Sequence, residues 1–410
     1  MVKVRRQTNI FGLLLILIMI LEDFFSPVDD QNQEKSWISS QFGTIIQVHA
    51  KQFPDLDQNL FDIALIGIED DRMAIHNNGC AKGSNIIRKK LYTLHEGNYK
   101  ARIADLGNIK AGNDVSDTYF ALKTAVSELV KKNIIPIILG GSQDLTYPQF
   151  EAYEQLDNQV DLVLIDSHFD LDLADIETSE INSKTYLNAI LLHEPNYLLN
   201  LSYVGYQSYF VNQDSVKAME QLYFDTHRLG ELTGKIQVCE PILRNADLIS
   251  FDIGAIRASD APGNGNAMPN GFYGEEACQI CRYAGMSDKL SSIGFYEYNP
   301  HFDQNEQTAS LIAQMIWYFI EGFYLRKHDH PNINHPDYLL YRAQIKNYEH
   351  EIIFVKSKKS DRWWIQIPYP DNPISKNERY RWIPCTYEDY QTATDGEMPN
   401  IWWRTYQKLI

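Results

Sequence analysis

The stretch from Leu162 to Asp170 constrains the fold of this chain more than any other part of its sequence. It reads Leu-Val-Leu-Ile-Asp-Ser-His-Phe-Asp, and its first four residues form an apolar run typical of a strand buried on both faces of a parallel sheet. Asp166, His168 and Asp170 follow at every second position, and Asp172 extends the series. Since alternate side chains of a strand point to the same side, we expect two carboxylates and an imidazole to converge at one sheet edge.

In α/β proteins, ligands bind at the carboxyl ends of the strands, which is where this acidic cluster would lie. Like charges are costly there unless a cation or hydrogen-bond donors offset them. This stretch therefore indicates a metal site, and the competing interpretation is a solvated strand end with an Asp-rich loop.

Apolar strands alternate with amphipathic helices along the chain from Phe61 to Tyr324. The expected strands are 61–68, 103–106, 134–139, 162–165, 203–210, 248–252 and 290–298. The expected helices are 83–94, 117–133, 215–222, 275–284 and 308–324. This alternation predicts an α/β fold with a doubly wound, mostly parallel sheet over residues 61–330.

The composition changes at about Arg326. Three histidines there lie among Asp residues and two prolines, which is typical of a polar linker, with a metal-binding His tract as the alternative. Beyond the linker, Glu351 to Ile367 is predicted to form a hairpin. Five of the seven tryptophans fall in this tail: Trp363, Trp364, Trp382, Trp402 and Trp403. We interpret residues 331–410 as a small Trp-rich accessory module whose aromatic anchors contact the main domain or a protein partner.

The net charge of -17 argues against nucleic acid or an anionic membrane as a partner, because either would be repelled over most of the surface. Five cysteines are few and odd in number, unlike a disulfide scaffold. Cys278 and Cys281 form a Cys-x-x-Cys pair inside a helical pattern, and we interpret them as buried thiols rather than zinc ligands.

Near the N-terminus, three basic residues precede an apolar run from Ile10 to Leu21, which is the layout of a signal peptide. The run is too short to span a bilayer, and acidic residues follow it without a small-x-small cleavage site. We favour a translation start at Met19, with residues 1–18 as a misassigned extension rather than a membrane anchor and residues 19–60 as an N-terminal extension. A cytoplasmic protein is the corresponding expectation.

Three segments resemble, in order and spacing, the motifs of the ureohydrolase family, which includes arginase, agmatinase and formimidoylglutamase. They are Gly140-Gly141-Ser142-Gln143-Asp144, Asp166-Ser167-His168-Phe169-Asp170 and Ser250-Phe251-Asp252-Ile253-Gly254. Glu297-Tyr298-Asn299-Pro300 and Ala261-Pro262-Gly263 are similar to later elements of the same family. The resemblance covers about residues 60–325 and implies an arginase-like three-layer sandwich, and the C-terminal module lies outside it.

The resemblance also implies two manganese ions with six shared ligands, and a bridging hydroxide that attacks an amidine or guanidine carbon. The ligands would come from position 143, Asp166, His168, Asp170, Asp252 and position 254. Gln143 stands where the family has His, and Gly254 stands where it has Asp. Gln143 still offers a carbonyl oxygen to the first ion, whereas Gly254 offers no side chain, so we expect the second ion to be absent or weakly bound.

Three nearby aspartates are candidates to replace the missing ligands. Asp144 is a poor replacement at the first site, because a shift of one residue along an extended segment turns the side chain to the other face. Asp172 and Asp260 remain open as substitutes at the second site. The loop at 182–187 offers no proton-shuttling His, and His193 is interpreted as a surface or packing residue.

Glu297 is retained at the position that, by the resemblance, contacts the guanidinium end of a substrate. We therefore expect an arginase/formimidoylglutamase-family protein with an impaired binuclear centre, weakly active or non-catalytic, that is retained for ligand binding or scaffolding. It would bind at most one divalent ion (Mn or Mg), weakly, and a small amidino or guanidino molecule. The alternatives are an active metal-dependent hydrolase of linear amidines and a structural role for the Trp-rich tail, and a homo-oligomer is left open.

Overall fold

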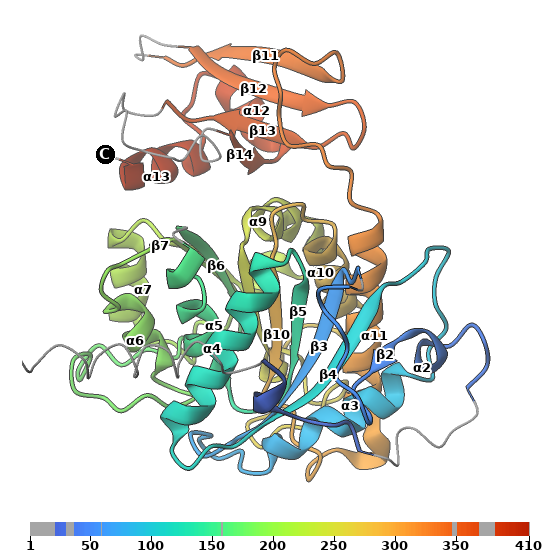
Figure 1. The fold of residues 1–410 in the computed structure, drawn as a ribbon. Helices are drawn as coiled ribbons and strands as arrows, with labels where there is room; N and C mark the ends of the chain where they lie inside the picture. The colour runs from blue at the N-terminus through green and yellow to red at the C-terminus, as the bar shows by residue number, and fades with distance from the viewer. Residues whose placement is uncertain are drawn as a thin grey trace, which may run out of the picture.

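A mostly parallel sheet forms the centre of the main domain in the computed structural model (Figure 1). The structure describes residues 21–29, 37–58, 60–156, 159–346, 351–368 and 382–409, so the expected leader and the start at Met19 lie outside the described residues. The strands of this sheet are β1 (Phe25–Ser26), β2 (Gln47–Val48), β3 (Ile63–Glu69), β4 (Ile103–Lys110), β5 (Ile135–Leu139), β6 (Val160–Ile165), β7 (Leu198–Tyr206), β8 (Asp225–Arg228), β9 (Leu248–Asp252) and β10 (Ser292–Tyr296). Their spatial order is β1-β4-β3-β5-β10-β9-β6-β7-β8, with β2 paired to β4. Among the described pairs of this sheet only β1–β4 is antiparallel, which confirms the predicted doubly wound, mostly parallel sheet.

Helices cover both faces of the sheet and complete three layers (Figure 1). They are α2 (Phe42–Ile45), α3 (Gly83–Leu91), α4 (Val115–Lys131), α5 (Thr146–Glu151), α6 (Tyr186–Leu191), α7 (Gln213–Gln221), α8 (Leu229–Leu232), α9 (Cys239–Asn245), α10 (Gly274–Gly285) and α11 (Gln307–Tyr324). On one face, α3, α9, α10 and α11 pack on the sheet, and on the other face α4, α5, α6 and α7 do so. The predicted three-layer sandwich is therefore confirmed.

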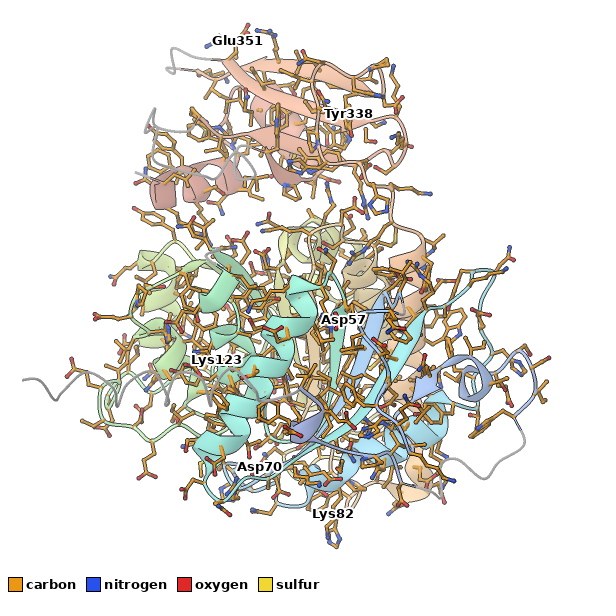
Figure 2. All side chains as sticks on the ribbon, in the orientation of Figure 1. Asp57, Asp70, Lys82, Lys123, Tyr338 and Glu351 are labelled. Carbon is orange, nitrogen blue, oxygen red and sulfur yellow. The ribbon has the colours of Figure 1, made fainter. Side chains whose placement is uncertain are left out.

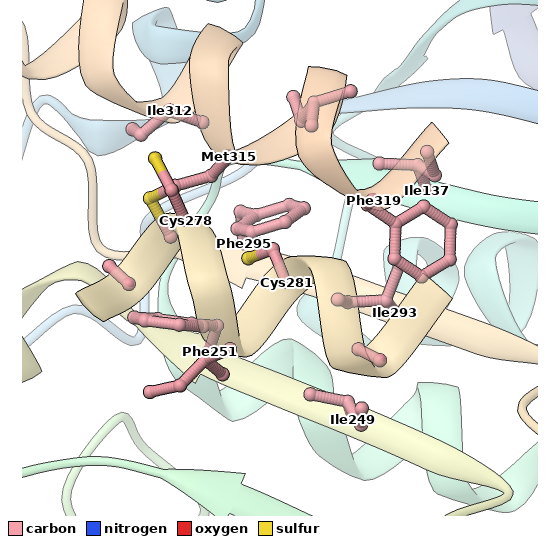
Figure 3. Close-up of a cluster of buried hydrophobic side chains, with 14 of the residues drawn as sticks. Ile137, Ile249, Phe251, Cys278, Cys281, Ile293, Phe295, Ile312, Met315 and Phe319 are labelled. Atoms are coloured by element: carbon pink, nitrogen blue, oxygen red, sulfur yellow. The ribbon is translucent and has the colours of Figure 1, made fainter. Parts of the chain in front are cut away.

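The central strands are apolar because both of their faces are covered. Every residue of β5, β6, β9 and β10 is buried, as is typical of parallel strands between two helix layers. Figure 3 shows the core on the α10 and α11 side, where Cys278 and Cys281 lie among Phe295, Met315 and Phe319. The two thiols are buried and free of disulfides, so their predicted packing role is confirmed.

A second, antiparallel sheet forms the C-terminal module. Its strands are β11 (Tyr338–Gln344), β12 (Glu351–Ser357), β13 (Trp363–Gln366) and β14 (Trp382–Cys385), paired in that order, and α12 (Tyr387–Thr394) and α13 (Asn400–Leu409) follow. The predicted hairpin is confirmed as β12 and β13, with Phe354 opposite Ile365. A separate hydrophobic core joins this sheet to its two helices.

The module lies against the end of the main domain where the parallel strands begin. Figure 2 shows Asp70, just after β3, at one end of the molecule and Tyr338 of the module toward the other. Buried Arg244, in α9, donates to the backbone oxygen of Trp363 at 3.2 Å, and its guanidinium carbon lies 4.5 Å from the Trp364 ring centroid. The expectation that tryptophans anchor the module on the main domain is thus confirmed for Trp364.

Some element boundaries differ from the predictions for identifiable reasons. α4 begins at Val115 because Asp114 caps it, with the backbone N–H of Asp114 donating to Asp117 Oδ2 at 3.1 Å. The strand expected at 203–210 is β7, which begins earlier and ends at Tyr206.

In the part of the chain that the structure describes, no helix is both long and apolar enough to cross a membrane.

Candidate acidic centre

Four neighbouring strands end side by side at the carboxyl edge of the sheet and bring predicted site residues together. β6 is followed by Asp166, β9 ends at Asp252, and β10 is followed by Glu297. β5 leads through Gly140 into the short 3-10 helix η4 (Gln143–Leu145). Asp166, Asp252 and Glu297 are at most 3% exposed. The strand ends therefore form a buried acidic cluster, which we call the acidic centre.

The segment after β6 is a turn, which corrects the expectation that strand alternation brings Asp166, His168 and Asp170 to one sheet edge. β6 ends at Ile165, and Asp166 Oδ1 accepts a hydrogen bond from the backbone N–H of His168 at 3.0 Å. Aspartate commonly turns the chain by accepting from a residue two positions further on. Asp170 is buried with Asp166, so the two carboxylates reach the centre through a turn and not through strand alternation.

His168 lies at the border of the acidic centre. Its ring stacks on Phe210 with the ring centroids 4.6 Å apart, and its Nδ1 lies 2.8 Å from Ser167 Oγ. The pKa of His168 lies below its usual value, chiefly because the ring is buried. The charge of Asp166 raises this pKa and the charge of Lys184 lowers it, and burial outweighs Asp166. Neutral imidazole is the form that binds metals, and a ligand role for His168 remains a prediction.

Glu297 is held by protein donors on both of its carboxylate oxygens. Its Oε1 accepts from the backbone N–H of Gln143 at 2.8 Å, and its Oε2 accepts from Asn77 Nδ2 at 2.7 Å. Burial raises the pKa of Glu297 to about 7, although Lys184 and these hydrogen bonds lower it. Glu297 therefore joins the end of β10 to two loops of the centre, and a contact with substrate remains a prediction.

Position 254 contributes no side chain to the centre. Gly254 lies in η7 (Ile253–Ala255), and its backbone N–H donates to Asp252 Oδ1 at 2.6 Å. A Cβ at this position would lie 3.1 Å from Asp252 Oδ1 and 3.2 Å from Asn264 Nδ2. A larger residue here would thus have to displace one of these side chains slightly.

The other candidate residues are engaged elsewhere. Asp144 Oδ2 accepts from Tyr119 OH at 2.6 Å, and burial raises the Asp144 pKa to about 6. Asp172 Oδ1 accepts a backbone N–H two residues further on, and Asp260 Oδ2 accepts the first backbone N–H of α10. His193 follows α6 and packs edge-on against aromatic rings, which confirms a packing role. Each of these three aspartates thus has a local hydrogen-bond partner, and a substitute ligand role for Asp172 or Asp260 remains a prediction.

Lys184 is the residue of the centre that the sequence analysis missed. Its Nζ lies 3.3 Å from Asp170 Oδ1, while the Asp170 side chain is fully buried and 30% of the Lys184 side chain is exposed. Burial lowers the Lys184 pKa, but the charges of Asp170, Asp166, Asp252 and Glu297 outweigh burial and raise it above its usual value. Burial raises the pKa of Asp170 and of Asp252, and Lys184 opposes both shifts. A cationic side chain in the loop after an Asp-rich motif is the signal that could have revealed it.

The residues present do not fit a pair of metal ions in the arrangement that the resemblance implies. One ligand position holds Gly254, another holds the amide of Gln143, and an ammonium group lies against Asp170. Among the residues that the structure describes, no three His, Cys, Asp or Glu side chains form a group that could hold a metal ion. What the arrangement offers directly is a buried set of carboxylates with one internal cation.

Comparison with known proteins decides the family. The model of the arginase family matches residues 61–321. This chain belongs to the arginase family. Formimidoylglutamase of Staphylococcus epidermidis is 25% identical over 299 residues, which cover 70% of this chain and 93% of that protein. Formimidoylglutamase of Staphylococcus haemolyticus is 26% identical over 271 residues, which cover 63% of this chain and 85% of that protein.

Solved structures show the same fold as this arginase-family chain. Formimidoylglutamase of Bacillus subtilis matches with a TM-score of 0.64 and 20% identity, covering 72% of this chain and 96% of that one. Formiminoglutamase of Trypanosoma cruzi, crystallised with Mn²⁺, matches with a TM-score of 0.60 and 22% identity, covering 67% of this chain and 100% of that one. The arginase fold predicted from the motifs is therefore confirmed.

Proposed function

We propose that this arginase-family chain carries an impaired binuclear centre, so that it is weakly active or non-catalytic and is retained for ligand binding or scaffolding. The observation that carries the proposal is Gly254, which offers no side-chain ligand where the family pattern requires a carboxylate. Two-metal hydrolysis needs both ions to position and activate the attacking water. Without the second ion, most of that rate enhancement is lost.

A single divalent ion, Mn or Mg, is the most that the remaining donors favour. Asp166, Asp170 and Asp252 do not form a three-ligand group in the described structure, so an ion would have to draw these carboxylates and the amide oxygen of Gln143 together. All four groups are hard oxygen donors of the kind that suits either metal. Losing a direct ligand should weaken binding at least as much as losing a partner of a ligand, which costs about 10–100-fold. We therefore expect this ion to bind weakly.

The ligand we propose is a small amidino or guanidino molecule. Buried carboxylates at a strand edge recognise such cations through charge-assisted hydrogen bonds. Glu297 supports this class because each of its oxygens accepts only one hydrogen bond described here and can accept another. Exposed aromatic surface on the C-terminal module, such as Trp403, supports a second role in binding a protein partner.

A second candidate function is metal-dependent hydrolysis of C–N bonds in linear amidines. Its support is that the relatives with about 25% identity are formimidoylglutamases. Asp166, His168, Asp170 and Asp252 are also retained at the motif positions. In this case one ion, or a rearranged pair, would have to activate the water.

Hydrolysis assays on the full chain separate the two candidates. Formamide or urea release would be followed from formimino and guanidino compounds, with and without added MnCl2, alongside calorimetric binding of the same compounds. We expect binding without appreciable turnover. A kcat of roughly 1 per second or more, which is ordinary for enzymes, would replace the first proposal with the second.

A further inference from the structure

The Lys184 ammonium lies at the acidic edge where the family pattern places metal charge. We propose that Lys184 is a built-in cation that stabilises the acidic centre in place of a metal ion. The observation behind it is the contact of Lys184 Nζ with the buried Asp170 carboxylate at 3.3 Å. The inference rests on the proposed function, because it explains how an arginase-family centre persists without two bound ions.

Hydrogen bonds hold the backbone around Lys184 in place. They keep the turn that carries this side chain next to the acidic centre. Ser183 N–H donates to the backbone oxygen of Met73 at 2.9 Å, and Ser183 Oγ accepts from the backbone N–H of Ile75 at 3.0 Å. Asn182 Oδ1 accepts the backbone N–H of Lys184 itself at 2.8 Å. These bonds join the turn before α6 to the loop after β3.

The same turn is joined directly to the acidic motif. The backbone N–H of Leu187, in α6, donates to the backbone oxygen of Asp170 at 3.2 Å. Lys184 and Asp170 are therefore held together by the main chain as well as by their charges. Because the backbone of both residues is already held in place, the ion pair costs the entropy of the lysine side chain but little further backbone entropy.

The charge balance explains why a cation is needed at this place. Asp166, Asp170, Asp252 and Glu297 are at most 3% exposed, and buried carboxylates are costly unless they are paired. Lys184 interacts with all four, most strongly with Asp170. A divalent ion that bound Asp170 would have to displace or repel this ammonium, so lysine and metal compete for the same oxygen atoms.

The test compares wild type with Lys184→Met, which removes the charge and keeps most of the aliphatic chain. The control is Lys217→Met, since Lys217 is 68% exposed and pairs with exposed Asp214 at 3.0 Å. In buffer with EDTA, we expect Lys184→Met to lower the Tm by roughly 5 °C or more. Added MnCl2 should raise the Tm of Lys184→Met by several degrees and leave wild type and the Lys217→Met variant nearly unchanged.

Two further variants keep the inference falsifiable if Lys184→Met fails to fold. Lys184→Arg preserves the charge, and the double variant Lys184→Met with Asp170→Asn removes one charge of each sign, so both should fold. If neither folds, Lys184 has a packing role and the inference is wrong. Equal Tm values and equal MnCl2 responses in wild type and Lys184→Met would also overturn it.

The outcomes separate this inference from the proposed function. If wild type lacks turnover and the Tm of Lys184→Met does not change with MnCl2, only the proposal of a built-in cation is contradicted. A wild-type protein with strong turnover in MnCl2 contradicts the impaired centre, whatever the Tm of the Lys184 variants.

Discussion

Glu297 Oε1 accepts a hydrogen bond from the backbone N–H of Gln143 at 2.8 Å. The residue expected to contact substrate is thus bound to the residue expected to contact metal. This bond also joins the end of β10 to the turn after β5, so changes at Glu297 affect the framework of the acidic centre as well as its ligand.

We expect Glu297→Ala to lower the free energy of unfolding by about 2–4 kcal/mol, because it removes the carboxylate acceptor of two buried donors. These donors are Gln143 N–H and Asn77 Nδ2, and Asn77 Nδ2 keeps its bond to the backbone oxygen of Glu297 at 2.9 Å. Glu297→Gln should cost less, since its amide oxygen can still accept one of these bonds. Urea denaturation measures both values. Unchanged stability in Glu297→Ala would mean that the carboxylate does not hold these segments together.

Asp70 provides a pH-dependent contribution to stability away from the acidic centre. Burial raises its pKa, but hydrogen bonds from Arg72, at 3.0 Å to Oδ1, and from Thr118, at 2.7 Å to Oδ2, outweigh burial and lower it. Because the pKa is lower in the folded state, the contribution is present above the unfolded value near 4 and is lost as the pH falls through the folded value.

Asp70→Asn should therefore destabilise the protein by about 1–3 kcal/mol near pH 7. The difference from wild type should shrink below about pH 4. Urea denaturation of both proteins at several pH values measures this difference in the free energy of unfolding. A stability difference that stays constant from pH 7 to pH 3 would show that the Asp70 charge is not involved.

Arg244→Met should loosen the C-terminal module. The change removes the bond to Trp363 and the contact with the Trp364 ring, and it leaves Glu240 without one of its two arginine partners. We expect the free energy of unfolding to fall by about 2–4 kcal/mol, and we expect faster proteolysis in the linker that follows α11.

Arg342→Met is the matched control, because Arg342 is an exposed arginine that pairs with Glu351 within the module. This variant should change neither stability nor proteolysis appreciably. If Arg244→Met and Arg342→Met are cleaved at the same rate, Arg244 does not anchor the module.

Gln143→His combined with Gly254→Asp should raise manganese affinity sharply, because it restores the two ligand types that the family pattern contains. The new Asp is expected to cost stability without metal, since its Cβ would lie 3.1 Å from Asp252 Oδ1. Calorimetry with MnCl2 measures the affinity. A double variant that binds no better than wild type would show that the motif positions are wrongly aligned.

The sequence predicts the fold well wherever burial is strong. β5, β6 and β9 are short apolar runs because both of their faces are covered, and α11 shows a clear helical period. β8 reads Asp-Thr-His-Arg and lies at the edge of the sheet. Its strand character comes from pairing with β7, which no local pattern reveals.

The acidic residues of the centre could be predicted from the sequence, but its cation could not. Asp166, Asp252 and Glu297 each follow or end an apolar strand, and parallel strand ends meet at one edge. Lys184 reaches this edge from a loop whose position depends on contacts with the segment after β3. The turn at Asp166 was likewise hidden, because alternate spacing fits both a strand and an Asp turn.

Elemental analysis of the purified full chain after dialysis tests the central claim most directly. We expect at most one divalent ion per chain, held weakly enough to be lost on extended dialysis. Two manganese ions per chain that survive dialysis would contradict it.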